Sequence, residues 1–312
     1  MKTTLLLLTL TITPVFFPTL QAQPVPPGGG GSPCTNCPPS AIYTNSPGRT
    51  IVDLEVRYVG TLRLELFDRD KPASVKNFLQ YIFSNDYTNS LIHRAATNSV
   101  FQGGSLRIID FGGGSKAVVP VSEKPSVTNE LMTGLFFSNG RGTIALAHYP
   151  GQTNNATCHW FINLADNTYL DAPDTNNAYV VFGRVISGLE NLDKLNPSAT
   201  NTTIKILNLG GYLTEAPVRP TATVSTVTYD DLLTVTYRII TLDMNLQLQS
   251  LLNNVRSVSW QSVSNKQHTL SYTSQLGSAW TNILTTNGNG ATQTFPHTNS
   301  SSNGFYRLQY QP

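Results

Sequence analysis

An arginine followed by a glutamine and a pair of glycines is the feature of this sequence best suited to chemistry. Arg94 lies eight residues before Gln102, and Gly103 and Gly104 follow at once, in the stretch LIHRAATNSVFQGG. An arginine between short strands needs a partner or a ligand, because an unpaired charge is costly to remove from water. The glycines permit close backbone approach or a positive φ, which side chains would block. The stretch therefore predicts a site organised around a fixed cation.

Cysteines and histidines could support redox exchange or metal binding, but their positions disfavour both. Cys34 and Cys37 lie in a Pro/Gly/Ser-rich segment and do not begin a helix after a strand, as a redox pair would. We expect them to form a local disulfide. Cys158 and His159 are neighbours in a predicted strand, so their side chains should point to opposite faces. The sequence therefore predicts no metal site, and Cys158 should be a buried free thiol.

The segments before Arg94 have the patterns of a strand and an amphipathic helix. Thr61–Phe67 alternates apolar and polar residues with a period of two, which predicts a half-buried strand. Pro72 then begins a helix at a position that tolerates proline. The apolar residues of this helix share one face, which should pack inward: Val75, Phe78, Leu79 and Ile82.

Further apolar runs of strand length follow the Arg94 stretch, at 142–147, 160–164, 179–185 and 204–209. A second short helix is marked by Leu189, Leu192 and Leu195. The glycines at 112–114 lack the Lys-Ser/Thr ending and the following helix of a phosphate-binding loop, so they predict only a loop. Several strands with two helices indicate a closed or nearly closed antiparallel sheet.

Beyond a proline-bearing joint at 215–220, the sequence predicts a second β domain. Its expected strands are rich in Thr, Ser and Asn and fall at 222–240, 255–260, 270–273 and 305–310. Asn/Ser/Gly turns separate them, a pattern typical of a small β-sandwich. The absence of a clustered set of charged residues or metal ligands favours a spacer or adhesive module.

The first 22 residues have the pattern of a secretory signal peptide. Lys2 precedes an apolar run, and Leu20–Ala22 fits a small-residue cleavage site. Because the run is short for a membrane span, we expect an exported protein with no span in the mature chain. Its location would be the periplasm, the cell surface or the extracellular space, with a retained N-terminal anchor as the alternative. Residues 23–50 would form a Pro/Gly-rich linker.

The charge of the chain excludes some partners. Charged residues make up only 12% of the sequence, and the net charge is +2. No basic tract is present, which argues against nucleic acid and anionic membranes. A length of 312 residues suggests about two domains, which we place at 51–213 and 214–312. We expect a monomer.

Residues 51–213 resemble the cyclophilin-type peptidyl-prolyl isomerases, particularly bacterial ones. The matching blocks are LRLELFDRDKPASVKNFLQYI (62–82), IHR (92–94) with FQGG (101–104), GTIALA (142–147), FINLADNTYLD (161–171) and YVVFGRVISGLENLDKL (179–195). The resemblance implies a mainly β fold, a closed eight-stranded antiparallel β-barrel with two capping helices. The smaller all-β sandwich would follow it.

The resemblance also implies a site and a cofactor-free activity, the cis–trans isomerisation of X-Pro bonds. Arg94 matches the essential arginine of the family, and Gln102 matches the glutamine that orients it. The apolar socket for proline would be lined by Val100, Phe161 and Leu170. Ala147 and His148 would contact the peptide through their backbone, and Tyr179 would lie at the rim.

Several positions depart from the family pattern. Ser99 replaces an aromatic residue, so one wall of the socket is either missing or supplied by Phe101 through a shifted strand. His159 replaces a glutamine and could still hydrogen-bond the peptide, with a pH-sensitive charge. Trp160 replaces an aromatic, and Tyr169 replaces a tryptophan. Losing an aromatic contact should weaken proline binding by ~1–3 kcal/mol, so we expect a slower isomerase.

Three functions therefore remain open. The first is an isomerase that helps exported proteins fold and binds proline-containing peptides or unfolded chains. The second is a catalytically weak peptide-binding or surface adhesive protein, favoured by Ser99 and His159. The third is a structural protein led by its C-terminal module. Intact Arg94 and Gln102 favour the isomerase.

Overall fold

The computed structural model describes residues 49–171, 177–241, 243, 246–250, 255–275, 278–298 and 304–310. The chain divides into one compact unit that ends at Thr241 and a second that runs from Leu242 to Pro312. The predicted leader, the predicted disulfide of Cys34 and Cys37, and all but the end of the predicted linker lie outside the described residues. No helix within the described ranges is both long enough and apolar enough to cross a membrane.

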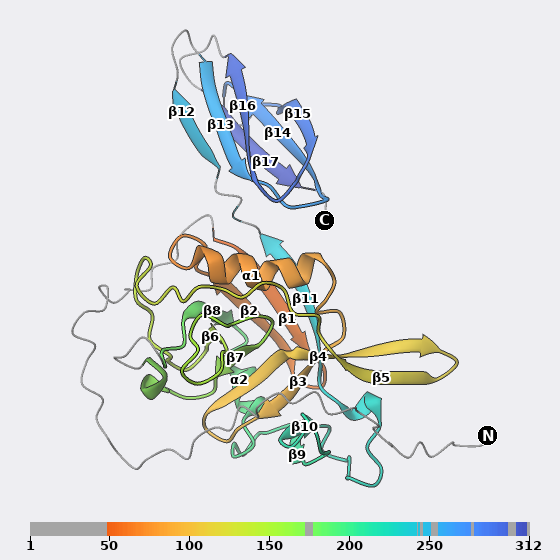
Figure 1. Ribbon diagram of the computed structural model, residues 1–312. Helices are drawn as coiled ribbons and strands as arrows, with labels where there is room; N and C mark the ends of the chain where they lie inside the picture. Colours follow the sequence, from red (N-terminus) through yellow and green to blue (C-terminus); the bar gives the residue numbers. More distant parts are fainter. Residues whose placement is uncertain are drawn as a thin grey trace. The chain divides into compact units, whose positions relative to one another are not determined.

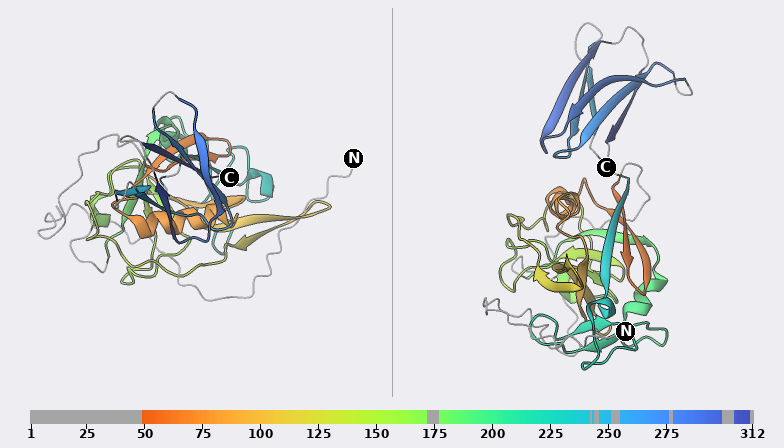
Figure 2. Two further views of the ribbon diagram at one scale, coloured as in Figure 1. Left: turned by 90° about the horizontal axis from the view of Figure 1, so that it is seen from above. Right: turned by 90° about the vertical axis from the view of Figure 1, so that its right-hand side faces the viewer.

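The first unit is built on a closed barrel of eight antiparallel strands (Figures 1 and 2). The ring runs in the order β3-β11-β1-β2-β8-β6-β7-β4 and closes where β4 pairs with β3. The strands are β1 (Ile51–Val56), β2 (Gly60–Leu66), β3 (Ser90–Ala95), β4 (Val100–Gly112), β6 (Thr143–Leu146), β7 (Trp160–Asn163), β8 (Val181–Ser187) and β11 (Thr234–Thr241). The predicted fold class is therefore confirmed.

Two helices accompany the barrel, α1 (Pro72–Phe83) and α2 (Glu190–Leu195). Both helices were predicted, and most of the apolar residues that predicted them bury one face. The exceptions are Ile82, which is only partly buried, and Leu189, which precedes α2 and is exposed. The ring of Phe78 in α1 is fully buried, 5.4 Å from the ring centre of Phe182 in β8 and 6.0 Å from that of Tyr237 in β11. These aromatic contacts fix α1 against the strands.

Helix α1 begins at Pro72 because residues far along the chain satisfy its first turn. The carboxylate of Glu130 accepts hydrogen bonds from the backbone of Ala73 (2.9 Å) and from the backbone and hydroxyl of Ser74 (2.8 and 2.7 Å). The buried ammonium of Lys71 donates in return to the backbone carbonyls of Glu130 and Thr133. Buried helix ends need such partners for their free N–H groups.

The strand that closes the barrel is not the predicted one. The run at 204–209 forms β9 (Lys205–Leu207), which pairs with β10 (Ala216–Val218) in a separate two-stranded sheet. Strand β11, which we assigned to the sandwich, pairs with β1 and β3 instead. The predicted domain boundary at 213/214 is therefore wrong, since the first unit continues to Thr241. An alternating strand has the same local pattern in a barrel as in a sandwich.

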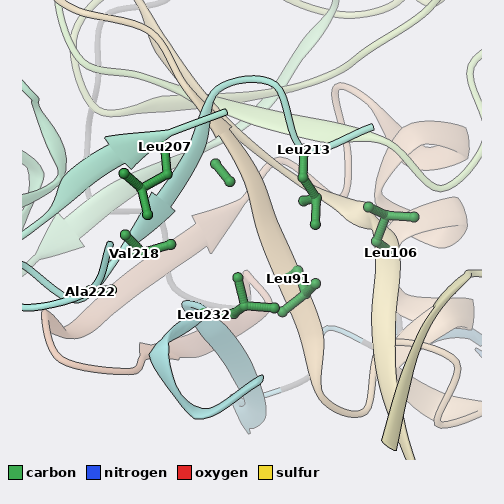
Figure 3. Packing of buried hydrophobic residues seen from close by; sticks show 8 residues of the cluster. Leu91, Leu106, Leu207, Leu213, Val218, Ala222 and Leu232 are labelled. Atoms are coloured by element: carbon green, nitrogen blue, oxygen red, sulfur yellow. The ribbon is translucent and has the colours of Figure 1, made fainter. Parts of the chain in front are cut away.

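The segment between β9 and β11 is held to the barrel by its own apolar cluster (Figure 3). Leu91 of β3 and Leu106 of β4 provide the barrel side of this cluster. The segment provides the other side with Leu207, Leu213, Ala216, Val218, Ala222 and Leu232. A short 3-10 helix, η2 (Tyr229–Asp231), precedes β11. Burial of these side chains stabilises the segment against the β3–β4 pair.

Strand β5 (Ser115–Pro120) pairs only with β4 among the described strands and forms a long hairpin that projects from the barrel (Figures 1 and 2). The glycines at 112–114 form its tip, all with positive φ. They are a turn between two strands, which confirms the prediction of a loop.

The second unit consists of two three-stranded sheets. One contains β12 (Gln247–Ser250), β13 (Val255–Gln261) and β16 (Thr292–Thr298), and the other contains β15 (Thr281–Asn287), β14 (Gln267–Thr273) and β17 (Phe305–Tyr310). Val258, Trp260 and Leu270 from the two sheets pack in one buried cluster. The predicted small sandwich is therefore confirmed, without the strand at 222–240.

Candidate active site

Three of the predicted site residues lie in one row that crosses four strands. Arg94 of β3 lies opposite Gln102 of β4, Gln102 lies opposite Phe161 of β7, and Phe161 lies opposite Ala145 of β6. Paired residues in a sheet point to the same face, and neighbouring strands are about 4.8 Å apart. Val100 belongs to the same face, because it is two residues from Gln102 on β4.

Arg94 is held from two sides. Its Nη1 donates a hydrogen bond to Oε1 of Gln102 at 3.1 Å, and its Nε donates to the carboxylate of Glu215. The backbone also joins these segments, since the amide of Ala95 donates to the carbonyl of Glu215 at 3.1 Å. The Arg94 side chain is 13% exposed and that of Glu215 is 46% exposed. The guanidinium is therefore oriented before any ligand arrives.

The glycine pair after Gln102 makes room for Trp160. A Cβ atom at Gly103 would lie 2.5 Å from the Trp160 ring, and one at Gly104 would clash with the Cys158 carbonyl. Gly104 also has a φ of +86°, which favours glycine. The pair serves close packing of β4 on β7.

An apolar cluster continues the row. Its buried residues are Phe67, Val100, Phe137, Ala145, Ala147, Phe161 and Val181. Leu170 and Tyr179 pack at its margin and are partly exposed. The Tyr179 ring meets the Phe161 ring edge-on at 5.5 Å, and burial raises the pKa of its hydroxyl. The predicted socket residues Val100, Phe161 and Leu170 thus lie together with Ala147 and Tyr179.

Phe101 does not belong to this face, contrary to one of our two explanations for Ser99. It is fully buried, and its ring lies 6.0 Å from Trp160 in an edge-on contact. Trp160 in turn meets Tyr237 of β11 at 6.4 Å. Because side chains alternate along a strand, Phe101 points into the barrel while Val100 and Gln102 point out. No shift of β4 brings it to the socket.

Comparison with known proteins gives the family. A family model described as cyclophilin type peptidyl-prolyl cis-trans isomerase/CLD matches residues 51–211. The chain belongs to this family. A peptidyl-prolyl cis-trans isomerase of Acinetobacter baylyi is 33% identical over 164 residues, which cover 52% of this chain and 79% of that protein. Peptidyl-prolyl cis-trans isomerase A of Dickeya dadantii is 36% identical over 153 residues, covering 49% and 72%.

The barrel unit is thus a cyclophilin-type peptidyl-prolyl cis-trans isomerase. Among solved structures, a Cryptosporidium parvum cyclophilin crystallised with the dipeptide Ala-Pro is 22% identical. The alignment covers 61% of this chain and 99% of that one, with a TM-score of 0.40.

The cyclophilin barrel replaces the missing aromatic with a polar pair. The hydroxyls of Ser99 and Tyr169 lie 3.3 Å apart and share a hydrogen bond. Tyr169 belongs to η1 (Thr168–Asp171) and is 54% exposed. The margin of the apolar cluster near Leu170 is therefore more polar than an aromatic residue at position 99 would make it.

The two predicted peptide-contacting histidines differ in their surroundings. The His148 ring is buried, stacks on Tyr179 at 4.2 Å, and lies within hydrogen-bond distance of the Tyr149 and Ala178 carbonyls. Its side chain thus fixes the segment that carries Tyr179. The His159 ring is partly buried, and burial lowers its pKa to about 4. His159 is therefore neutral at neutral pH and does not change its charge there.

Cys158 is a buried free thiol, as predicted. The geometric reason for excluding a metal is nevertheless wrong. Strand β7 begins only at Trp160, and Cys158 lies in a bend before it. The Cys158 sulfur, a ring nitrogen of His159 and a carboxylate oxygen of Glu123 all lie within 4.8 Å of one another. Strand alternation does not apply outside a strand.

Sequence reasoning missed Glu215 altogether. It is separated from Arg94 by 121 positions and lies just past the matched region, in a joint to which we gave no role. The one available signal was the expectation that a half-buried arginine requires a partner.

Proposed function

We propose that Arg94 is the catalytic residue of this isomerase. The barrier to rotation about a peptide bond is ~18–20 kcal/mol and arises from resonance between the carbonyl and the nitrogen lone pair. A guanidinium N–H that donates to the prolyl nitrogen favours a pyramidal nitrogen, which occurs only in the twisted transition state. Contacts that strengthen in that state raise the rate. Arginine suits the role because it stays protonated and its donors form a rigid fork.

The orientation of Arg94 supports this proposal most directly. Its Nε and one Nη1 hydrogen are engaged by Glu215 and Gln102. The guanidinium carries five N–H donors, so others remain available for a substrate. Gln102 would orient both the arginine and the carbonyl that precedes proline. No covalent intermediate and no cofactor is needed for this chemistry.

The proline ring would bind at the apolar cluster beside this row. Leu170 and Tyr179 are two of the three partly exposed residues at its margin and would make first contact, with Val100 and Phe161 behind them. The backbone of Ala147 and His148 would bind the neighbouring peptide. The polar Ser99–Tyr169 pair would weaken the contact with proline and slow the enzyme.

The substrates would be X-Pro bonds in unfolded exported proteins. This part of the proposal depends on the leader-like residues 1–22. Uncatalysed prolyl isomerisation takes tens to hundreds of seconds, so a monomeric catalyst in the periplasm or outside the cell would speed folding there.

A second candidate is a peptide-binding or surface adhesive protein with little catalysis. It is favoured by the carboxylate of Glu215, which pairs with Arg94 and reduces its net charge. Ser99 and His159, which depart from the family pattern, also favour this second candidate. An adhesive role would belong to the second unit. Its sequence, in which we expected no cluster of charged residues, favours a spacer or adhesive module.

Proline-peptide exchange measured by NMR separates the candidates. We expect wild type to accelerate exchange in an Ala-Pro peptide and Arg94→Ala to lose most of that rate. Arg141→Ala, which removes an exposed arginine paired with Asp193, is the matched control and should retain it. Equal rates for wild type and Arg94→Ala would end the proposal and favour the second candidate.

A further inference from the structure

Three metal-ligand side chains converge beside the start of β7. They are Glu123, Cys158 and His159, whose ligand atoms lie within 4.8 Å of one another. Glu123 comes from the loop after β5, whereas the other two precede β7. Two segments distant in sequence therefore direct a carboxylate, a thiol and an imidazole to one point.

These side chains have few other partners. Across the described ranges, the Glu123 carboxylate makes no ion pair or hydrogen bond, and neither ring nitrogen of His159 makes a hydrogen bond. The lysine next to Glu123 does not compensate its charge, since Lys124 pairs with Asp86 at 2.7 Å. The exposed Glu123 carboxylate is therefore not committed to another cation and can turn toward an ion beside the thiol and the imidazole.

We propose that Glu123, Cys158 and His159 form a binding site for a zinc ion. Cysteine, histidine and carboxylate are the protein ligands of Zn²⁺, which they bind at about 2.0–2.3 Å. Ligand atoms bound tetrahedrally at those lengths lie about 3.3–3.8 Å apart. The three ligand atoms, which lie within 4.8 Å of one another, therefore need only small side-chain movements to bind one ion. On binding, the Cys158 thiol gives its proton to solvent as the sulfur–zinc bond forms.

The surroundings fit an open site rather than a closed structural one. Glu123 is exposed, which gives the ion access from solvent, while Cys158 is buried beneath it. Three protein ligands leave a fourth tetrahedral position for water or another donor. His93 packs edge-on against His159 at 6.0 Å, and its Nδ1 is engaged by the Ser105 hydroxyl at 2.9 Å.

The test uses tag-free, reduced, full-length protein carrying Cys34→Ser and Cys37→Ser, because that CxxC pair could itself bind zinc. Cobalt(II) replaces zinc as a visible probe and absorbs through charge transfer when bound to a thiolate. We expect one cobalt per chain, with a thiolate band that zinc removes by displacement. Cys158→Ser should abolish this band.

Titration with zinc against a chelating dye then measures each ligand. Glu123→Gln and His159→Gln should weaken zinc binding by at least the ~10-fold that loss of an outer-shell partner causes. Glu55→Gln and His297→Ala change the same residue types elsewhere and should leave binding unaltered. Because Glu123 is exposed, its variant tests the site even if a change at buried Cys158 unfolds the chain. A cobalt spectrum without the thiolate band, or zinc affinity unchanged in Glu123→Gln, would overturn the proposal.

Discussion

Replacing Glu215 tests whether a residue outside the family-matched region positions the proposed catalytic arginine. Its carboxylate accepts the Nε–H of Arg94, while Gln102 accepts an Nη1–H. With both partners present, the guanidinium plane is fixed against β4. With Glu215→Ala, one of the two restraints disappears, and Arg94 should spend less time in the orientation that meets the prolyl nitrogen.

The size of the effect follows from the strength and exposure of the pair. A hydrogen bond between charged groups contributes about 1.5–3 kcal/mol, but the Glu215 side chain is 46% exposed, so solvent screening favours the low end. A loss of about 1.4 kcal/mol is tenfold in rate. We therefore expect Glu215→Ala to lower kcat about tenfold, and Glu215→Gln, which keeps a neutral acceptor, to lower it about threefold. KM should change little, because the contact between Arg94 and the prolyl nitrogen, which Glu215 would position, strengthens only in the transition state.

The assay is prolyl-peptide exchange in four proteins: wild type, Glu215→Ala, Arg94→Ala and the double variant. If Glu215 acts through Arg94, its substitution should have no further effect once Arg94 is gone. A merely structural role would instead reduce activity equally in both backgrounds and lower the unfolding midpoint. Glu190→Gln, at an exposed glutamate of α2, should leave the rate unchanged. An unchanged rate in Glu215→Ala would refute the positioning role, and a faster rate would show in addition that the carboxylate inhibits the enzyme.

Other properties can be tested in the same way. Glu130→Ala should lower the free energy of unfolding by about 2–3 kcal/mol in urea, since it removes three hydrogen bonds at the start of α1, and Glu130→Gln should cost less. Burial lowers the pKa of Lys71 from 10.5 to about 8, so the unfolded chain binds more protons between those values. The free energy of unfolding of wild type, measured by urea titration, should therefore rise between pH 8 and 10 by up to ~3 kcal/mol relative to that of Lys71→Met. Ser99→Phe should lower KM for proline peptides by about tenfold, measured by peptide titration, because it restores an aromatic wall. A chain that ends at residue 241 should unfold cooperatively on heating, whereas one that ends at 213 should not.

Local patterns predicted the elements well because each element carries its own period. Helix α1 follows from Pro72 and the spacing of its apolar residues, and the alternation of β4 places Val100 and Gln102 on one face. The same alternation excludes Phe101 from that face, so the shifted strand that we considered for it contradicted the rule we were using. The prediction that the socket residues lie together came from the family resemblance of the matched blocks, not from periodicity.

Pairings between distant segments could not be predicted in this way. The alternation of β11 predicts a strand but not its neighbour, and the choice between barrel and sandwich depends on which sheet has an open edge. Likewise, nothing near Glu215 indicates that it meets Arg94. The bend at Cys158 is also invisible locally, which is why strand alternation led us to exclude a metal.

The segment that follows the family-matched region contains both β11 and Glu215, whose partners the sequence did not predict. Residues 51–211 contain seven of the eight barrel strands, and the missing one, β11, fills the gap between β1 and β3. The chain that leads to β11 passes β3 and places Glu215 against Arg94 on the way. Closure of the barrel and orientation of the proposed catalytic cation thus depend on one stretch of chain. A change that weakens the pairing of β11 should therefore lower activity and stability together, whereas Glu215→Ala should separate them.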